Sequence, residues 1–341
     1  MMTTIKKLIY GLLFFPLCLQ LTSCNNDDDD NNDSANDSVV LPENITFESQ
    51  SLYPEDFAYD SNNDRFFTGS AYTGNIVTVD LEGNVTTFAN SDDLIATVGL
   101  LFDETNNQVV VCNTNPGFSD KGITETTNIL ATVIRYDATT GEVVSSHDLS
   151  TLLDGPHLIN DIVLDTEGNL YVTDSFSPAI YKITSEGETS IFATDPLFET
   201  ATGTFGLNGI EFHPDGYLLV THYQNQILYK VSINDPTDIT EIAIDTEVGS
   251  GDGIRLMDDN NLLFVSNSLG GGDHTVYTIN SNDAWSTASV SNSVSLGNGP
   301  DFPTTIEYVN STPYVISSYI AELATGMSSD TSTFEINKIN F

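Results

Sequence analysis

The sequence predicts an all-β fold, a six-bladed β-propeller with four-stranded blades. From residue 44 onward, short runs of β-branched and aromatic residues are separated by Gly, Asn and Asp turns, and no convincing helical period appears. A motif recurs within these runs, most clearly at residues 158–174 and 206–222, with a third copy at 250–267. A repeat of about 50 residues that holds several short strands is typical of a propeller blade.

The remaining blades follow from weaker copies of the motif. These copies begin at Tyr53, Thr97 and Pro303, and together with the three clear copies they make six blades. In each copy an inner strand leads through a tight turn into a second strand, after which a third strand follows. The chain ends with residues 334–341, which we expect to form the third strand of the last blade. Residues 45–49 are then predicted to add its outer strand and close the ring.

The N-terminus predicts an exported lipoprotein. Lys6 and Lys7 precede an apolar run that ends near Leu21, and this run is shorter than the roughly 20 residues that a transmembrane helix needs. A retained transmembrane helix and a buried helix are the alternatives. Residues 21–24, Leu-Thr-Ser-Cys, resemble the bacterial lipoprotein box, which implies that residues 1–24 are a signal peptide and that Cys24 carries lipid. We therefore expect a protein anchored to the outer membrane.

An acidic segment, residues 25–43, separates the predicted lipid anchor from the predicted propeller at 44–341. Residues 25–38 offer almost no apolar surface to bury, so the segment is predicted to be a disordered tether. An acidic stretch directly after a lipid-modified cysteine also resembles the export tag of surface-displayed lipoproteins in some bacteria with two membranes. This resemblance implies exposure at the cell surface.

Charge and cysteine content exclude several functions. The formal net charge of -40 excludes nucleic acid as a natural partner, because phosphate binding needs clustered Lys and Arg. The same charge attracts divalent cations toward any site with oxygen ligands. Without Cys18 and Cys24, only Cys112 remains as a thiol, so no disulfide framework is expected. Cys112 follows an apolar run and is predicted to be an inert core thiol in a monomer.

The six inner strands of a propeller begin beside the central channel, so equivalent residues at their starts should converge. Four of these residues offer carboxylate or amide oxygens, which suit Ca²⁺ better than a tetrahedral zinc site. The alternative is that Asn208 and Asp252, each followed by glycine, only form turns. Glu55 and Asn160 lack that glycine and still occupy equivalent positions. The six positions are Glu55, Val98, Asn160, Asn208, Asp252 and Thr304.

The segments around these four residues resemble a known family. Pro54-Glu55-Asp56, Asn160-Asp161, Leu207-Asn208-Gly209-Ile210 and Asp252-Gly253-Ile254 are similar to the metal-ligand motifs of the family of gluconolactonase, regucalcin (senescence marker protein) and diisopropyl fluorophosphatase. The resemblance covers residues 44–341. It implies that Glu55, Asn160, Asn208 and Asp252 bind one divalent ion, and that Asp252 acts as base or nucleophile. Sugar-acid lactonases of this family carry an arginine where this chain has Leu158, which weakens the case for aldonolactones.

Further candidate residues stand where the second strand of each blade returns to the same face. We expect the ends of these strands to rim a substrate pocket, with Asn160 beside them. For His222, a role in proton transfer and a purely polar role at the channel mouth are both open. The insertion 115–128 is expected to shape the pocket or cover it as a lid. The strand ends are Ser70, Asn113, Asp174, His222, Asn267 and Ser317, of which Asn113, Asp174, His222 and Asn267 are the predicted substrate contacts.

The predicted function is a metal-dependent hydrolase that acts on a small-molecule lactone or related ester, with Asp252 as general base or nucleophile. The alternative is a non-catalytic surface propeller that binds a ligand or a partner and uses the ion structurally. The chain contains no Gly-Lys-Ser phosphate loop, no paired His metal helix and no Gly-x-Ser-x-Gly elbow. Common nucleotide and serine-hydrolase mechanisms therefore lack support.

Overall fold

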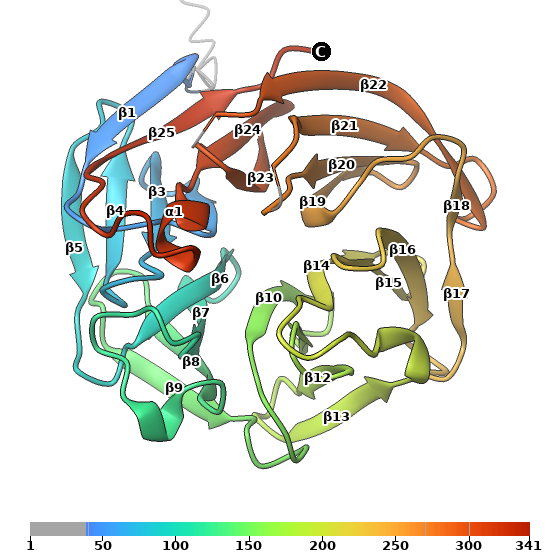
Figure 1. The fold of residues 1–341 in the computed structure, drawn as a ribbon, viewed down its shortest axis with the longest axis horizontal. Coiled ribbons are helices and arrows are strands. Elements are labelled where there is room, and N and C mark those ends of the chain that lie inside the picture. The colour runs from blue at the N-terminus through green and yellow to red at the C-terminus, as the bar shows by residue number, and fades with distance from the viewer. Residues whose placement is uncertain (1–38, 40, 270, 300) are drawn as a thin grey trace, which may run out of the picture. The chain divides into compact units, whose positions relative to one another are not determined.

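The computed structural model describes residues 39, 41–269, 271–299 and 301–341. These residues form six sheets arranged in a ring around a central opening (Figure 1), which confirms the predicted six-bladed propeller. Within the described ranges, no helix is long and apolar enough to cross a membrane. The predicted signal peptide, Cys24 and most of the predicted tether lie outside the described residues.

The blades follow one another along the chain, and each begins with its innermost strand. Blade one holds β2 (Phe57–Asp60), β3 (Arg65–Gly69), β4 (Ile76–Asp80) and β5 (Val85–Ala89). Blade two holds β6 (Ala96–Asp103), β7 (Gln108–Thr114), β8 (Ala131–Asp137) and β9 (Val143–Asp148). Blade three holds β10 (Ile159–Leu164), β11 (Leu170–Asp174), β12 (Ala179–Ile183) and β13 (Thr189–Thr194).

A short strand that follows blade four adds to the sheet of blade five. Blade four holds β14 (Leu207–His213), β15 (Tyr217–His222), β16 (Ile227–Ser232) and β17 (Ile239–Glu241). Blade five holds β19 (Gly251–Asp258), β20 (Asn261–Ser266), β21 (His274–Asn280) and β22 (Thr287–Gly297). The short β18 (Ala243–Ile244) follows β17 but pairs in parallel with β22, so blade five has a fifth strand that the sequence did not indicate.

The ring closes in blade six as predicted. This blade holds β23 (Pro303–Val309), β24 (Thr312–Ser317), β25 (Thr333–Lys338) and, as its outer strand, β1 (Asn44–Glu48). β1 pairs antiparallel with β25, so Ile45 stands opposite Ile336 and Phe47 opposite Phe334. The first and last strands of the propeller are therefore joined in one sheet, and the closing strand lies one residue earlier than the predicted 45–49.

Among the described residues, helical structure is confined to short segments in the loops. The structure has a helix α1 (Ile320–Ala324) between β24 and β25, and two 3₁₀ turns, η1 (Thr124–Thr126) and η2 (Pro196–Phe198). Turn η1 lies inside the insertion that separates β7 from β8. In Figure 1, α1 lies near the centre of the ring, on the side of blades one and six.

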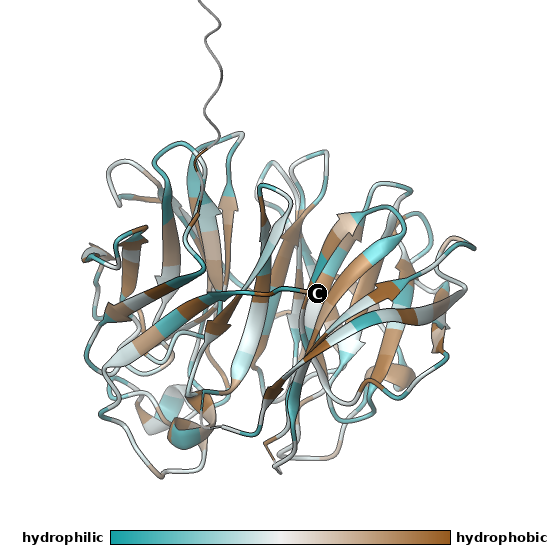
Figure 2. Ribbon diagram, turned by 90° about the horizontal axis from the view of Figure 1, so that it is seen from above, coloured by the Kyte–Doolittle hydropathy of each residue, from teal (hydrophilic) through white to brown (hydrophobic). Residues whose placement is uncertain are grey.

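Apolar side chains fill the space between neighbouring blades. Cys112 of blade two, for example, packs in one cluster with Ile162 and Leu170 of blade three, and its side chain is fully buried, as predicted. Burial raises the pKa of the Cys112 thiol well above its usual value, which keeps the thiol unreactive. Figure 2 shows that many of the strongly hydrophobic (brown) segments lie within the strands of the blades, which also carry teal and white segments.

A β-bulge recurs at the start of the inner strand. In β10 the pairing with β11 shifts between Ile159 and Ile162, and β6, β14, β19 and β23 shift at the equivalent place. The bulge encloses the residue that the sequence places at the channel, Asn160 in the case of β10. Because a bulge re-aims side chains, it turns these residues toward the axis.

Aspartates next to the channel residues tie neighbouring blades together. The Asp56 carboxylate accepts a hydrogen bond from the backbone N–H of Leu100 in blade two, at 2.6 Å. Asp161 accepts one from the backbone N–H of Ile210 in blade four, at 2.9 Å. These bonds fix the inner strands of adjacent blades at the level of the channel residues.

Candidate functional site

All six channel positions line one cavity of 310 Å³ at the axis of the propeller. The structure thus brings together the four predicted ligands from blades one, three, four and five, and each side chain is at most 7% exposed. Across the described residues, no three His, Cys, Asp or Glu side chains are grouped as a metal site. The candidate donors are two carboxylates and two amides instead, and their role as ligands stays a prediction. The six positions are Glu55, Val98, Asn160, Asn208, Asp252 and Thr304.

Burial perturbs both carboxylates of this set. Burial raises the pKa of Asp252 to about 7, although a hydrogen bond from Asn267 acts in the opposite direction. The pKa of Glu55 is raised well above its usual value by burial first and then by the negative charge of Asp252. Without a cation, each carboxylate therefore disfavours ionisation of the other.

A second layer of charge lies deeper along the inner strands. Arg255 stands three residues beyond Asp252 on β19, and its guanidinium contacts Glu211 of blade four at 2.9 Å and Glu307 of blade six at 3.0 Å. Burial lowers the pKa of Arg255, but the surrounding carboxylates, Glu307 and Glu211 before Asp56 and Asp161, outweigh burial and raise it above its usual value. Arg255 offsets part of the charge of the axial carboxylates, which are Glu55, Asp56, Asp161, Glu211, Asp252 and Glu307.

A chain of hydrogen bonds holds the Asp252 carboxylate. Asn267 donates from its amide nitrogen to Asp252 at 2.5 Å and to the carbonyl of Pro303 at 2.7 Å. The Tyr223 hydroxyl donates to the Asn267 carbonyl oxygen at 2.8 Å. Asn267, predicted as a substrate contact, is absent from the cavity lining and instead orients Asp252.

The other three predicted substrate contacts also lie behind the cavity wall. Asn113 accepts a hydrogen bond from the backbone of Ile95, and Asp174 accepts one from the backbone of Leu158, each at 2.9 Å. His222 is fully buried. None of these three side chains lines the cavity, because the second strand of each blade lies one layer outside the inner strand. Asn113 and Asp174 thus brace the residues that lead into the inner strands. The His222 ring instead contacts Asn225 in the turn after β15.

Loops from several blades build the upper walls of the cavity. The predicted insertion after β7 contributes Pro116 and Phe118, which fits the expectation that it shapes the pocket. Sequence reasoning missed the contribution of α1, because its five residues carry no helical period. It also missed a row of aromatic rings on loops of blades three and four. The apolar and aromatic wall residues are Val98, Pro116, Phe118, Leu158, Phe176, Phe205, Tyr223, Leu269, Phe302, Ile320 and Ala324.

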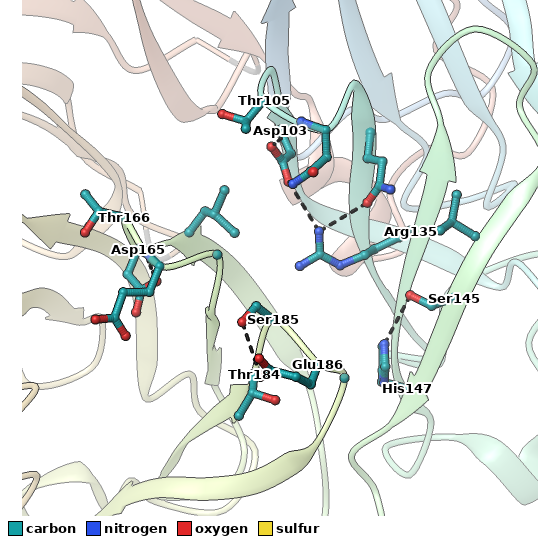
Figure 3. Close-up of a pocket in the computed structure, with 17 residues that line it drawn as sticks. Asp103, Thr105, Arg135, Ser145, His147, Asp165, Thr166, Thr184, Ser185 and Glu186 are labelled. Atoms are coloured by element: carbon teal, nitrogen blue, oxygen red, sulfur yellow. Dashed lines mark hydrogen bonds and ion pairs between the residues drawn. The ribbon is translucent and has the colours of Figure 1, made fainter.

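A larger cavity of 680 Å³ lies between blades two and three, where inner strands β6 and β10 end (Figure 3). Its polar side chains contact one another: Arg135 reaches Asp103 at 3.4 Å, and the His147 ring contacts the Ser145 hydroxyl at 3.1 Å. The cavity contains none of the residues that the sequence assigns to a site. The axial cavity is therefore the candidate functional site.

No protein-family model and no curated protein matches the chain. Solved structures share its fold. The major allergen Mala s 1 of Malassezia sympodialis is 17% identical, with a TM-score of 0.68 over 88% of this chain and 97% of the allergen. A gluconolactonase from Xanthomonas campestris is 14% identical, with a TM-score of 0.55 over 87% of this chain and 89% of that enzyme. A luciferin-regenerating enzyme is 12% identical, with a TM-score of 0.57 over 87% of this chain and 97% of its own.

Identities this low establish a common fold and nothing finer. Gluconolactonase-like and luciferin-regenerating propellers stand among these neighbours, in agreement with the fold that the sequence resemblance implies.

Proposed function

We propose that this protein is a metal-dependent hydrolase of a lactone or a related ester. The observation that carries the proposal is the convergence of Glu55, Asn160, Asn208 and Asp252, from four separate blades, on one axial cavity. Support also comes from the shared fold with a protein described as a gluconolactonase.

The residues present fit a hard divalent cation. Carboxylate and amide oxygens are the ligands that Ca²⁺ prefers, and we propose Ca²⁺ as the ion. Glu55 and Asp252 repel each other and resist ionisation, so a cation between them would stabilise both charges. Held by these four side chains, the ion would polarise the substrate carbonyl and acidify a bound water.

Asp252 is the proposed general base. Burial raises the pKa of the Asp252 carboxyl in the metal-free protein. A bound cation would favour the ionised carboxylate, which is the form that accepts a proton from water. It would take a proton from the attacking water as the water oxygen bonds to the carbonyl carbon. It would return the proton to the alkoxide that leaves when the bond between that carbon and the ester oxygen breaks. Asn267 and Tyr223 hold the carboxylate in place, and apolar side chains line the walls around it.

The test combines metal analysis with one substitution. Purified protein should contain a divalent metal, and chelation should abolish hydrolysis of lactones and esters. Asp252→Asn should retain the fold and most of the metal while turnover falls at least about 100-fold. Asp258→Asn is the matched control, since Asp258 is exposed at the far end of the same strand. Full activity in Asp252→Asn would refute the base, and activity that survives chelation would refute the metal.

A non-catalytic ligand-binding propeller is the second candidate, favoured by Leu158 and the apolar walls around the cavity. It predicts a bound metal that raises the melting temperature, without turnover of any substrate in the panel. Metal-dependent turnover would eliminate it.

A further inference from the structure

The cavity has an oxygen-rich floor and an aromatic side wall. Phe176 from blade three, Phe205 from the loop before β14, and Tyr223 after β15 form a continuous row. The ring centroids of Phe176 and Phe205 lie 5.6 Å apart, and those of Phe205 and Tyr223 lie 6.0 Å apart. Such a row offers the faces and edges of its rings to a planar apolar ligand.

The opposite side of the ring adds a second apolar wall. Helix α1 of blade six contributes Ile320 and Ala324, and the insertion of blade two contributes Phe118. Blade six lies across the axis from blade three, so α1 stands on the opposite side of the ring from Phe176. Phe118 and Ile320 pack against the same small apolar cluster. A ligand that reaches the floor would therefore be enclosed by apolar groups on both sides.

The charge of the lining selects a neutral ligand. Among the described residues, the cavity lining contains no Lys, Arg or His, whereas Glu55 and Asp252 stand at the floor. An anionic ligand would find no basic side chain in the lining, and the charge of the proposed divalent ion is already offset by Glu55 and Asp252. A polyhydroxylated sugar lactone would place hydroxyl groups against apolar walls, where unpaired hydroxyls are costly.

The geometry points to a neutral aryl or alkyl lactone or ester as the substrate class, with its apolar body between the aromatic row and α1 and its carbonyl at the floor. This inference rests on the proposed hydrolase function for the reaction, but the choice of ligand rests on the walls alone. A volume of 310 Å³ is at the lower end of the range typical of small-molecule sites, about 300–1,000 Å³. A compact bicyclic lactone suits this size.

The experiment compares two six-membered lactones that differ in their polarity. Dihydrocoumarin is the aryl lactone and glucono-δ-lactone the polyhydroxylated one. Binding to the full-length metal-loaded protein is measured by displacement of the neutral fluorophore N-phenyl-1-naphthylamine immediately after mixing. Hydrolysis is followed separately in a pH-stat. We expect dihydrocoumarin to displace the fluorophore at a concentration at least about tenfold lower, since one unpaired buried hydroxyl alone weakens binding by about that factor.

Two variants locate the binding. Phe205→Ala should weaken binding of dihydrocoumarin about tenfold, because it removes the middle ring of the row. Phe192→Ala is the control, since Phe192 is a partly buried aromatic residue that packs on Tyr171 in blade three, away from the cavity. It should bind both lactones as the wild type does.

The outcomes separate this inference from the proposed function. Tight binding of dihydrocoumarin without its hydrolysis would refute the hydrolase and support the ligand class. Equal or tighter binding of glucono-δ-lactone would overturn the ligand class, whether or not that lactone is hydrolysed. Unchanged dihydrocoumarin binding in Phe205→Ala, or failure of the fluorophore to bind, would also overturn it.

Discussion

Substitution of Phe47 by alanine tests how much the closing strand stabilises the ring. Phe47 is the fourth of the five residues of β1 and is 1% exposed. Its ring centroid lies 5.9 Å from that of Phe334 on β25. Both rings belong to the apolar cluster between blades six and one. Phe47 thus connects the first strand of the propeller to a core built from both ends of the chain.

The expected loss follows from the burial of this side chain. Replacing a buried Phe by Ala costs about 3–5 kcal/mol, and β1 is an outer strand that can partly relax, so we expect about 3 kcal/mol. In a domain of this size, 1 kcal/mol shifts the melting temperature by roughly 2 °C, which predicts a decrease of about 6 °C. Deleting residues 44–50 should lower it further, because Ile45 and the backbone pairs of β1 are lost as well.

The assay is a urea titration and a thermal melt of the wild type, Phe47→Ala and Glu48→Ala. Glu48 is exposed on the same strand, so its substitution should change the free energy of unfolding by less than about 0.5 kcal/mol. A loss below about 1 kcal/mol in Phe47→Ala, or an unchanged melt after deletion of residues 44–50, would refute closure through this strand.

Two further substitutions test the interior. Burial lowers the pKa of His157, but the 2.7 Å contact of its ring with Asp174 raises it overall. The stabilisation from this ion pair is therefore complete below about pH 6.5, the unfolded value, and is lost as pH rises through the higher folded value. His157→Asn should flatten the fall of the urea midpoint between pH 6 and pH 9, and an unaltered slope would contradict this. Gly99→Ala would place a Cβ 2.2 Å from the Asn160 carbonyl oxygen, and the resulting separation of blades should cost about 1–3 kcal/mol by urea titration. The control is Gly216→Ala, in which the new Cβ meets no atom within 4 Å and only the backbone strain at φ +86° remains. An equal loss of unfolding free energy in both variants would refute the clash between residue 99 and Asn160.

The convergence of the channel residues could be anticipated because it follows from the repeat. Equivalent positions in a closed ring of blades must face the same axis, so aligning Asn160 with Asn208 and Asp252 was enough to place them in one cavity. The same reasoning also placed Asp174 and His222 at the rim of the cavity, whereas the cavity lining contains neither residue. Their strands end at the same face, but the inner strand lies between them and the axis, and alignment carries no information on this radial distance.

The walls of the cavity could not be anticipated for a different reason. Phe176, Phe205 and α1 belong to loops that differ from blade to blade, so no internal repeat marks them. Their neighbours are set by the closure of the ring, which brings blade six opposite blade three. Only the insertion after β7 could be predicted as part of the wall, because it is longer than the equivalent loops of the other blades.

The accumulation of carboxylates at the axis favours the proposed ligand site over simple turn chemistry. Turns would explain Asn208 and Asp252, yet they give no reason to bury Glu55 nearby, where burial and Asp252 both oppose its ionisation. Buried charge of one sign costs stability unless a partner neutralises it. Arg255 binds Glu211 and Glu307 directly, so its guanidinium hydrogen bonds go to this deeper layer. Within the part of the chain that the structure describes, no Lys, Arg or His forms an ion pair with Glu55 or Asp252. A cation bound at the floor would supply the missing charge, which is why we favour a ligand site over turn chemistry.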